Sequence, residues 1–363
     1  MTSPSTLVPV APQDVFALPG QGQLPPPPTV GRMLLHLTPE PGPLLLIATM
    51  AGLYLLGVRR LTDRGDAWNP WRTASWLAGL FVVGYALVGG IAAYDTALFS
   101  AHAVQHMLLG TVAPIPLALG APITLALRAL PRRSRGLLVA ALHSRVARVM
   151  AFPLVGFGLF IVSLYGLYFT SLYESSLRHP VLHLFLHIHF LVVGCLFYWP
   201  IIGLDPVPGR LPYWGRLILL FVTFPLHALW ALAMFTTNEV FAADWYSSLD
   251  RSWGSSLLGD QQTGAGLMWA AGELVGATVF VALFIQWSRA DGREAAREDR
   301  RLDRLERLAA SAAPGSATAD QEPQQIPETD PEPDPEADLV AREAAYNAWL
   351  ARLAAGDTGP ARR

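Results

Sequence analysis

Long apolar runs separated by short polar connections fill the chain between residues 43 and 287. A helix needs about 20 mainly apolar residues to cross a bilayer, and seven of these runs approach that length. We therefore predict an all-α fold, a polytopic membrane helix bundle of about seven transmembrane helices. The predicted spans cover residues 43–58, 74–93, 102–127, 150–170, 180–202, 216–237 and 264–287.

Proline interrupts the third run at Pro114, Pro116 and Pro122. A proline inside a helix removes one backbone hydrogen bond and clashes with the preceding turn. The third span is therefore predicted to be kinked or broken rather than a single straight helix. The breakers Pro206 and Pro208, which follow the fifth run, predict a rigid turn.

The arginines alternate in number from one connection to the next. The first, third and fifth connections and the C-terminal tail are rich in Arg. The N-terminus and the even-numbered connections carry one Arg each or none (Arg32, Arg178, Arg251). Because Arg and Lys concentrate on the cytoplasmic side of membrane proteins, this pattern predicts an N-out/C-in arrangement with a cytoplasmic C-terminal tail.

Five segments are expected along the chain. Residues 1–40 are rich in Pro and Gly and predict a disordered segment, and residues 41–288 form the transmembrane domain. Residues 289–312 alternate acid and base at helical spacing, which predicts a charged cytoplasmic helix. Residues 313–337 predict a disordered acidic, Pro-rich linker, and residues 338–363 a short amphipathic segment.

Composition narrows the functional class. The chain is 52% hydrophobic and only 15% charged, and its net charge is −2, whereas soluble domains carry about 25% charged residues. No basic patch interleaved with aromatic residues is present, so no nucleic-acid partner is expected. The single cysteine, Cys195, excludes an intrachain disulfide framework and is expected to be an inert buried thiol. Phosphate-binding loops, nucleophile elbows, HExxH and CxxC are absent from the sequence, and we expect no enzyme activity.

Two histidine pairs stand at i,i+4 spacing on the predicted outer half of the bundle, His102 with His106 and His183 with His187. Residues four apart share one helix face, so each pair can chelate one ion. Imidazole suits copper, zinc and iron. Two pairs on neighbouring helices therefore predict a metal site with three or four nitrogen ligands.

Three further residues extend this candidate ligand set. His179 precedes the second pair by one turn, His227 lies about as deep in the sixth span as His187 does in the fifth, and Met268 begins near the same layer. A thioether would bias the site towards Cu(I). His227 on its own is equally compatible with a core histidine hydrogen-bonded to Glu273.

Three carboxylates accompany these histidines. Glu273 lies inside the seventh span, where ionisable groups are costly and usually functional. Asp95 and Asp260 stand at the outer ends of spans. We expect these groups either to orient a metal-bound imidazole or to relay protons, with the alternative that Asp260 caps its own helix.

At these segments the sequence resembles the CtaG-like cytochrome c oxidase assembly factors of bacteria, the multi-span type linked to caa3-class oxidases. The matching positions are 99–109, 119–122, His179, Pro180, His183, His187, 199–206, 225–228, 260–262, Gly266, Met268, Trp269 and Glu273. The resemblance implies a multi-pass protein of the bacterial plasma membrane that assists oxidase maturation at the copper-delivery stage. Its implied partners are oxidase subunits, membrane lipid and a copper-donor protein on the extracytoplasmic side.

Two other functions remain open from the sequence. Helical histidines can also ligate haem, which would make the protein a membrane redox protein, but haem needs histidines facing each other across a gap. A copper or small-solute transporter would need a polar path through both halves of the bundle. The inner half offers Cys195 and few other polar groups, which disfavours transport.

Overall fold

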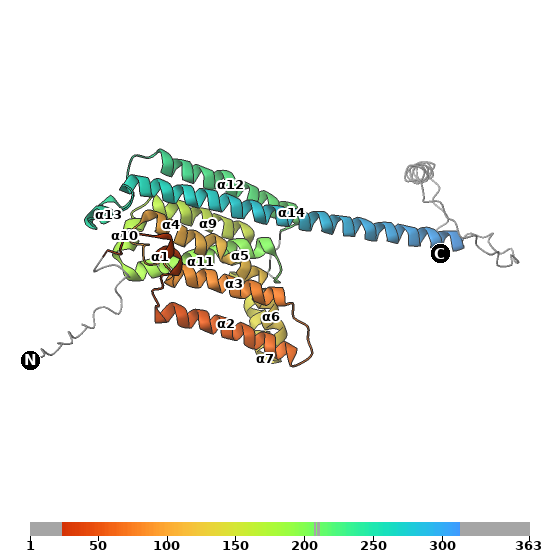
Figure 1. Ribbon diagram of the computed structural model, residues 1–363. Coiled ribbons are helices and arrows are strands. Elements are labelled where there is room, and N and C mark those ends of the chain that lie inside the picture. Colours follow the sequence, from red (N-terminus) through yellow and green to blue (C-terminus); the bar gives the residue numbers. More distant parts are fainter. Residues whose placement is uncertain (1–23, 207, 209–210, 313–363) are drawn as a thin grey trace, which may run out of the picture. The chain divides into compact units, whose positions relative to one another are not determined.

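The structure is a computed structural model that describes residues 24–206, 208 and 211–312, with backbone only for 309–312. The described residues form helices joined by short turns and no β-strand beyond an isolated bridge between Leu37 and Gly89 (Figure 1). The predicted all-α class is confirmed. The expected segments 313–337 and 338–363, and residues 1–23 of the N-terminal segment, lie outside the described residues.

Among the described residues, six helices are long and apolar enough to cross a membrane, and a bent pair of helices raises the number to seven. The expected polytopic bundle is therefore confirmed. Five of the six are α2 (Pro41–Thr62), α3 (Pro70–Val88), α11 (Pro180–Ile202), α12 (Tyr213–Thr236) and α14 (Leu257–Ala312), and the sixth is the interrupted span over residues 99–129. The bent pair is α9 (Pro153–Tyr168) and α10 (Leu172–Arg178), which meet at 71° where a single span over 150–170 was expected.

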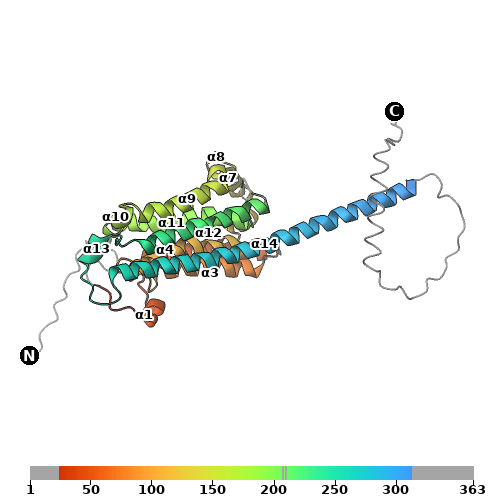
Figure 2. The ribbon, with the colours of Figure 1, turned by 90° about the horizontal axis from the view of Figure 1, so that it is seen from above.

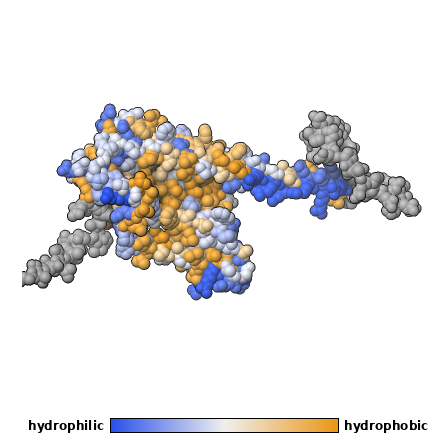
Figure 3. Space-filling model, in the orientation of Figure 1, coloured by the Kyte–Doolittle hydropathy of each residue, from blue (hydrophilic) through white to orange (hydrophobic). Residues whose placement is uncertain are grey.

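Large apolar side chains cover the flank of the bundle. Figure 3 shows hydrophobic residues along the side of the helices and hydrophilic residues gathered at their ends. Phe81, for example, is 73% exposed although it belongs to a long apolar helix. A soluble protein rarely exposes such a continuous apolar surface, so this surface is the one that faces lipid.

Prolines mark where several spans begin. α2, α3, α9 and α11 each have proline in the first turn, where the missing N–H has no helical partner to lose and the fixed φ favours the helix. At the start of α3 the Asn69 side chain also accepts a hydrogen bond from the Trp71 amide. α3 ends at Val88, before the predicted 93, because the chain turns at Gly89.

The third span is interrupted, as its prolines predict. It consists of α4 (Phe99–Met107), a π-helical turn η2 (Leu108–Val112), α5 (Pro114–Leu119) and α6 (Pro122–Ala129). The π-turn lies directly before Pro114, which cannot donate to the carbonyl of Gly110. The second break is at Ala121, which has a left-handed backbone with φ 48°. Beyond it, Asp205 caps α6 by accepting from the amides of Ile123 and Thr124 at 3.2 and 2.7 Å.

The third span and α11 pack against each other at very short range in the middle of the bundle (Figure 2). A Cβ atom on Gly194 of α11 would lie 2.1 Å from the carbonyl oxygen of Gly110 in η2. Glycine therefore allows the two backbones to touch. This contact holds α4 and the N-terminal half of α11 side by side, and these two segments carry the two histidine pairs.

Short helices occupy the connections. They are α1 (Val30–Leu35), α7 (Arg132–Leu142), α8 (Arg145–Met150) and α13 (Ala243–Ser248). Disorder was expected over residues 1–40, whereas residues 30–35 form the helix α1. The side chain of Thr29 caps the start of α1 by accepting a hydrogen bond from the Arg32 amide. α10 and α13 meet through the hydroxyls of Tyr173 and Tyr246, 2.6 Å apart.

The last helix, α14, continues from the membrane span through the charged residues 289–312, which were expected to be helical. The chain divides into two compact units, one ending at Ala295 and the other beginning at Ala296. Every residue discussed below belongs to the first unit.

Candidate metal centre

Four histidines from two helices meet at one end of the bundle. α4 supplies His102 and His106, and α11 supplies His183 and His187. The ring centroids of His102 and His106 are 4.1 Å apart, and those of His183 and His187 are 4.5 Å apart. Across the two helices the separations are 5.3 Å for His102 to His183 and 5.6 Å for His106 to His187. The i,i+4 spacing read from the sequence thus produces one compact group, called here the four-histidine cluster.

Three of these rings are completely enclosed and lack hydrogen bonds. His102, His106 and His183 are 0%, 2% and 0% exposed. The backbone of Asp95 lies close enough to the His102 ring to affect its charge. Even so, none of the six ring nitrogens has a hydrogen-bond partner among the described residues. Buried polar groups are almost always paired, because an unpaired one costs free energy. One nitrogen from each of these three rings lies within 4.8 Å of the others, which is the spacing that one metal ion needs.

A second group of three ligands overlaps the first. Asp95, His183 and His187 each offer an atom within 4.8 Å of the others, and Asp95 Oδ2 lies 3.6 Å from His183 Nε2. Burial raises the pKa of Asp95 to about 7. Asp95 therefore lies where the sequence analysis expected a carboxylate, beside a candidate ligand imidazole. His183 belongs to both groups.

Gln105 holds the fourth ring in place. Its Nε2 donates to the Ala86 carbonyl of α3 at 2.9 Å, and its Oε1 accepts from His187 Nε2 at 2.9 Å. The other ring nitrogen, Nδ1, is then the one with a free lone pair. A ligand histidine is usually oriented through its second nitrogen in this way. The sequence analysis did not single out Gln105, although an amide one residue before His106 in an apolar span was a signal.

Asp260 fixes the start of the helix that carries the first pair. Its two carboxylate oxygens accept from the Phe99 amide at 2.8 Å and from the Ser100 hydroxyl at 2.5 Å. Asp260 belongs to the first turn of α14 and caps the neighbouring helix α4, rather than its own helix or a metal-bound imidazole. Both alternatives considered from the sequence are replaced by this contact between helices.

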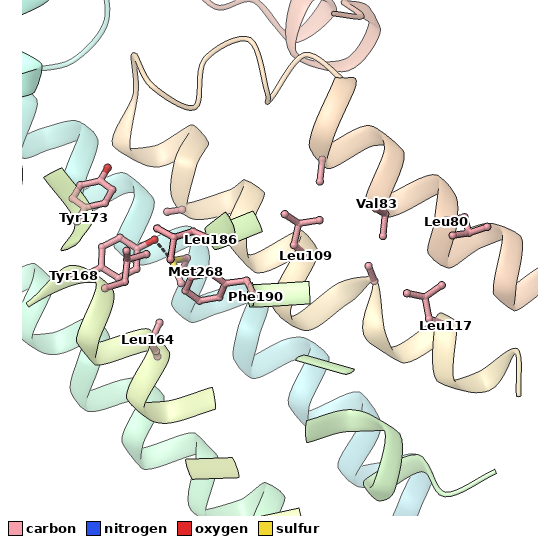
Figure 4. Close-up of a cluster of buried hydrophobic side chains, with 14 of the residues drawn as sticks. Leu80, Val83, Leu109, Leu117, Leu164, Tyr168, Tyr173, Leu186, Phe190 and Met268 are labelled. Atoms are coloured by element: carbon pink, nitrogen blue, oxygen red, sulfur yellow. Dashed lines mark hydrogen bonds between the residues drawn. The ribbon is translucent and has the colours of Figure 1, made fainter. Parts of the chain in front are cut away.

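Aromatic side chains enclose the cluster. Tyr173 stands edge-on to His102 at 4.9 Å and Phe190 lies 4.5 Å from His106, measured between ring centroids. Figure 4 shows Tyr168, Tyr173 and Phe190 in the same buried core, with Tyr168 turned towards Met268. These rings keep water away from the imidazoles, so any bound ion would meet protein ligands only.

His179 is not part of the cluster. Its backbone is extended, with φ −124° and ψ 106°, so the helical spacing to His183 that the sequence analysis assumed does not apply. The ring is exposed, and its Nδ1 lies 2.8 Å from the Ser175 carbonyl of α10. The structure therefore places His179 on the surface, away from the buried ligand group.

His227, Met268 and Glu273 lie together on α12 and α14. His227 stacks over Trp230 and has its Nδ1 4.0 Å from Glu273 Oε1, which is too long for a hydrogen bond. The Glu273 side chain is 31% exposed on the flank of the bundle. Met268 is buried, and its sulfur receives a weak contact from the Tyr168 hydroxyl at 4.0 Å. The metal-ligand groups found among the described residues include neither His227 nor Glu273.

Comparison with known proteins identifies one protein family. Residues 52–290 match the family described as cytochrome c oxidase caa3 assembly factor (Caa3_CtaG). The chain is 42% identical over 293 residues to an uncharacterized protein of Mycobacterium bovis and to one of Mycobacterium tuberculosis, covering 77% of this chain and 44% of each relative. An uncharacterized protein of Mycobacterium leprae is 40% identical over 257 residues, covering 69% of this chain and 39% of that relative.

The chain spans 44% of the length of the first two relatives. No solved structure matches it. The family match extends from α2 to the membrane part of α14 and includes all four histidines of the cluster. On this match the chain belongs to the cytochrome c oxidase caa3 assembly factor family.

Proposed function

We propose that this membrane protein assists assembly of a caa3-type cytochrome c oxidase by binding copper at the four-histidine cluster and passing it to an oxidase subunit. The family match supports the oxidase as client. The copper step is supported by one observation above all: six buried imidazole nitrogens on His102, His106 and His183 lack hydrogen-bond partners. A metal ion would satisfy one nitrogen on each ring.

The chemistry of the ligands suits a cargo ion that must be released. Imidazoles are neutral ligands, and a site with few anionic groups holds copper less tightly than a thiolate cage would. Cys195 lies two turns beyond His187 on α11 and is not in either ligand group. The only carboxylate in the two groups is Asp95. We expect the protein to act stoichiometrically, as a carrier without turnover.

The expected side of entry follows from the arginine pattern. The cluster lies at the Arg-poor end of the bundle, which the sequence assigns to the outside of the plasma membrane. Copper would then reach it from an extracytoplasmic donor protein. The client subunit would meet the bundle within the membrane.

The cluster geometry disfavours haem. His102 and His183 belong to different helices, and their ring centroids are 5.3 Å apart. A haem between two axial imidazoles would need room for the whole porphyrin, and the cavity next to the cluster has a volume of only about 30 Å³.

The test is the metal content of the detergent-purified full chain. We expect wild type to retain copper through gel filtration, and the double variant His102→Leu/His183→Leu to retain less copper than wild type, by the ion of the cluster, while keeping its helical content. Leucine avoids leaving unpaired nitrogens in the core. The matched control changes the three exposed histidines together, His36→Ala/His143→Ala/His179→Ala, and should retain copper.

Absence of copper from wild type, even after anaerobic loading with Cu(I), would contradict the copper proposal and leave an assembly role through protein contacts alone. A Soret absorbance band in the wild type would replace copper with haem. An undiminished copper content in the double variant would place the ion elsewhere in the chain.

A further inference from the structure

Two small cavities follow the four-histidine cluster towards the middle of the bundle. The first has a volume of about 30 Å³ and is lined by His106, Thr111, His227 and Met268 together with glycines and apolar side chains. The second, also about 30 Å³, is lined by His227 and by the hydroxyl-bearing residues Thr111, Tyr198 and Thr223. The two cavities share lining residues, and His227 is one of them. Each has room for about one water-sized particle, which excludes an organic ligand.

His106 connects the cluster with the first cavity. Its ring contacts His102 on one side and Phe190 on another, it is only 2% exposed, and neither Nδ1 nor Nε2 has a hydrogen-bond partner among the described residues. A neutral imidazole has one nitrogen with a free lone pair, so His106 can serve the cluster through one nitrogen in one tautomer, or the cavity through the other nitrogen in the other tautomer. The His106 imidazole is therefore a buried polar group without a partner in the described part of the chain, and a bound ion in the cavity would supply one.

The backbone of α14 brings the other two donors together. Met268 and Gly272 are four residues apart and share one face of the helix. The His227 ring lies directly on Gly272, because a Cβ atom there would be 2.3 Å from His227 Cε1. Glycine at 272 therefore allows the imidazole of α12 to lie against α14, one helical turn from position 268, and His227 and Met268 both line the first cavity.

We infer that the first cavity is a second copper position, specific for Cu(I), with His106, His227 and Met268 as its ligands. This inference rests on the proposed function and extends it: the ion would move from the four-histidine cluster to a deeper site through the shared ligand His106. Thioether and imidazole together favour a soft monovalent ion over Zn(II). His179, Asp95 and Glu273 are not ligands of this position.

The experiment is an anaerobic Cu(I) titration of the full chain in detergent against a chromophoric chelator, with X-ray absorption at the copper edge. Wild type should bind two Cu(I) ions, with sulfur scattering appearing only with the second. Met268→Leu should bind one Cu(I) ion and show nitrogen scattering alone. The matched control is Met107→Leu, since Met107 also lines the cavity, and this variant should behave like wild type.

The variants test the two copper positions separately. His102→Leu/His183→Leu should lose the first ion and keep the sulfur-ligated one, so loss of the first ion alone in that variant supports two positions. Wild type that binds a single Cu(I) without sulfur scattering overturns this inference and leaves the proposed function intact. Sulfur scattering that survives in Met268→Leu, or disappears in Met107→Leu, overturns the assignment of Met268. Wild type that binds no copper at all overturns both proposals.

Discussion

Single polar residues determine how the four histidines are presented. Asp260 caps α4, Gln105 ties α4 to α3 and to His187, and Asp95 lies beside His183. Each of these side chains is buried and belongs to a helix or turn adjacent to a ligand ring. The imidazoles are therefore held in position before any ion arrives, which lowers the ordering cost of binding.

Replacing Asp260 should destabilise the end of the bundle that carries the four-histidine cluster. Asp260→Ala removes the acceptor of two buried hydrogen bonds, and loss of a charged hydrogen-bond partner costs about 1.5–3 kcal/mol. We expect a reduced free energy of unfolding in a denaturant titration in micelles, with weaker copper retention. Asp260→Asn, which keeps one acceptor oxygen, should lose less. Asp244→Ala, an exposed aspartate in the first turn of α13, is the control and should behave like wild type; equal loss in both alanine variants would contradict the capping role.

Replacing Gln105 should weaken copper binding more than folding. Gln105→Leu removes the group that orients His187, and loss of such an orienting partner typically lowers metal affinity about 10- to 100-fold. Competition with a copper chelator measures this affinity, and circular dichroism measures the helical content, which should be retained. Gln262→Leu, at a partly exposed glutamine of α14, should leave the affinity unchanged. An unchanged affinity in Gln105→Leu would show that His187 is not a ligand.

The sequence predicts candidate ligands well only where it also predicts a regular helix. His102 with His106, and His183 with His187, each lie in one continuous helix, so i,i+4 spacing places them correctly. His179 fails because a proline follows it and the chain is extended there. Gln105 and Asp260 act across helices, on Ala86, His187, Phe99 and Ser100, and those partners depend on packing that no spacing rule within one segment contains.

At the scale of helices, the interrupted third span brings the site together. Its prolines predict the interruption, but the sequence does not reveal which helix fills the space. The structure shows that α11 packs there, with Gly194 against the carbonyl of Gly110, four residues before Pro114. Close backbone contact of this kind is typical of membrane helices, where small residues replace the hydrophobic driving force of water.

A methyl group at position 194 should push α11 away from the third span. In Gly194→Ala the new Cβ would meet the Gly110 oxygen at 2.1 Å, and overpacking of this kind costs about 1–3 kcal/mol. We expect a lower unfolding midpoint and loss of copper, because His183 and His187 would no longer face His102 and His106. Gly158→Ala, in α9, has open space for its methyl group and should match wild type. If Gly194→Ala retains full copper affinity, the glycine contact does not set the spacing of the cluster.

For the whole molecule, hydropathy predicts the number of spans more reliably than their ends. The expected seven spans correspond to six long helices and the bent pair α9 and α10 among the described residues. The bend at residues 169–171 follows a run of apolar and aromatic residues that predicts one continuous helix. The hydrophobic pattern of the sequence therefore contains no sign of the bend. After the bend, α10 is tied to α13 through the hydroxyls of Tyr173 and Tyr246, which lie far apart in the sequence.

The orientation of the bundle is a prediction about the whole molecule, and the single cysteine makes it measurable. In a Cys195→Ala background, Ser255→Cys places one thiol in the exposed connection just before Asp260, whose carboxylate caps α4 at the histidine end. Arg133→Cys places it in exposed α7, after the third span. The Arg-rich connections belong on the cytoplasmic side. A membrane-impermeant maleimide should therefore label Ser255→Cys in intact cells, and Arg133→Cys only after the cells are permeabilised.

The parent Cys195→Ala variant, which has no thiol, is the control and should remain unlabelled in both conditions. The reverse labelling pattern would place the four-histidine cluster on the cytoplasmic side. Copper would then have to come from a cytoplasmic donor, because the cluster lies near the end of the bundle that carries Asp95 and Asp260. Labelling therefore decides which compartment supplies the ion, independently of whether the cluster or the deeper cavity holds it.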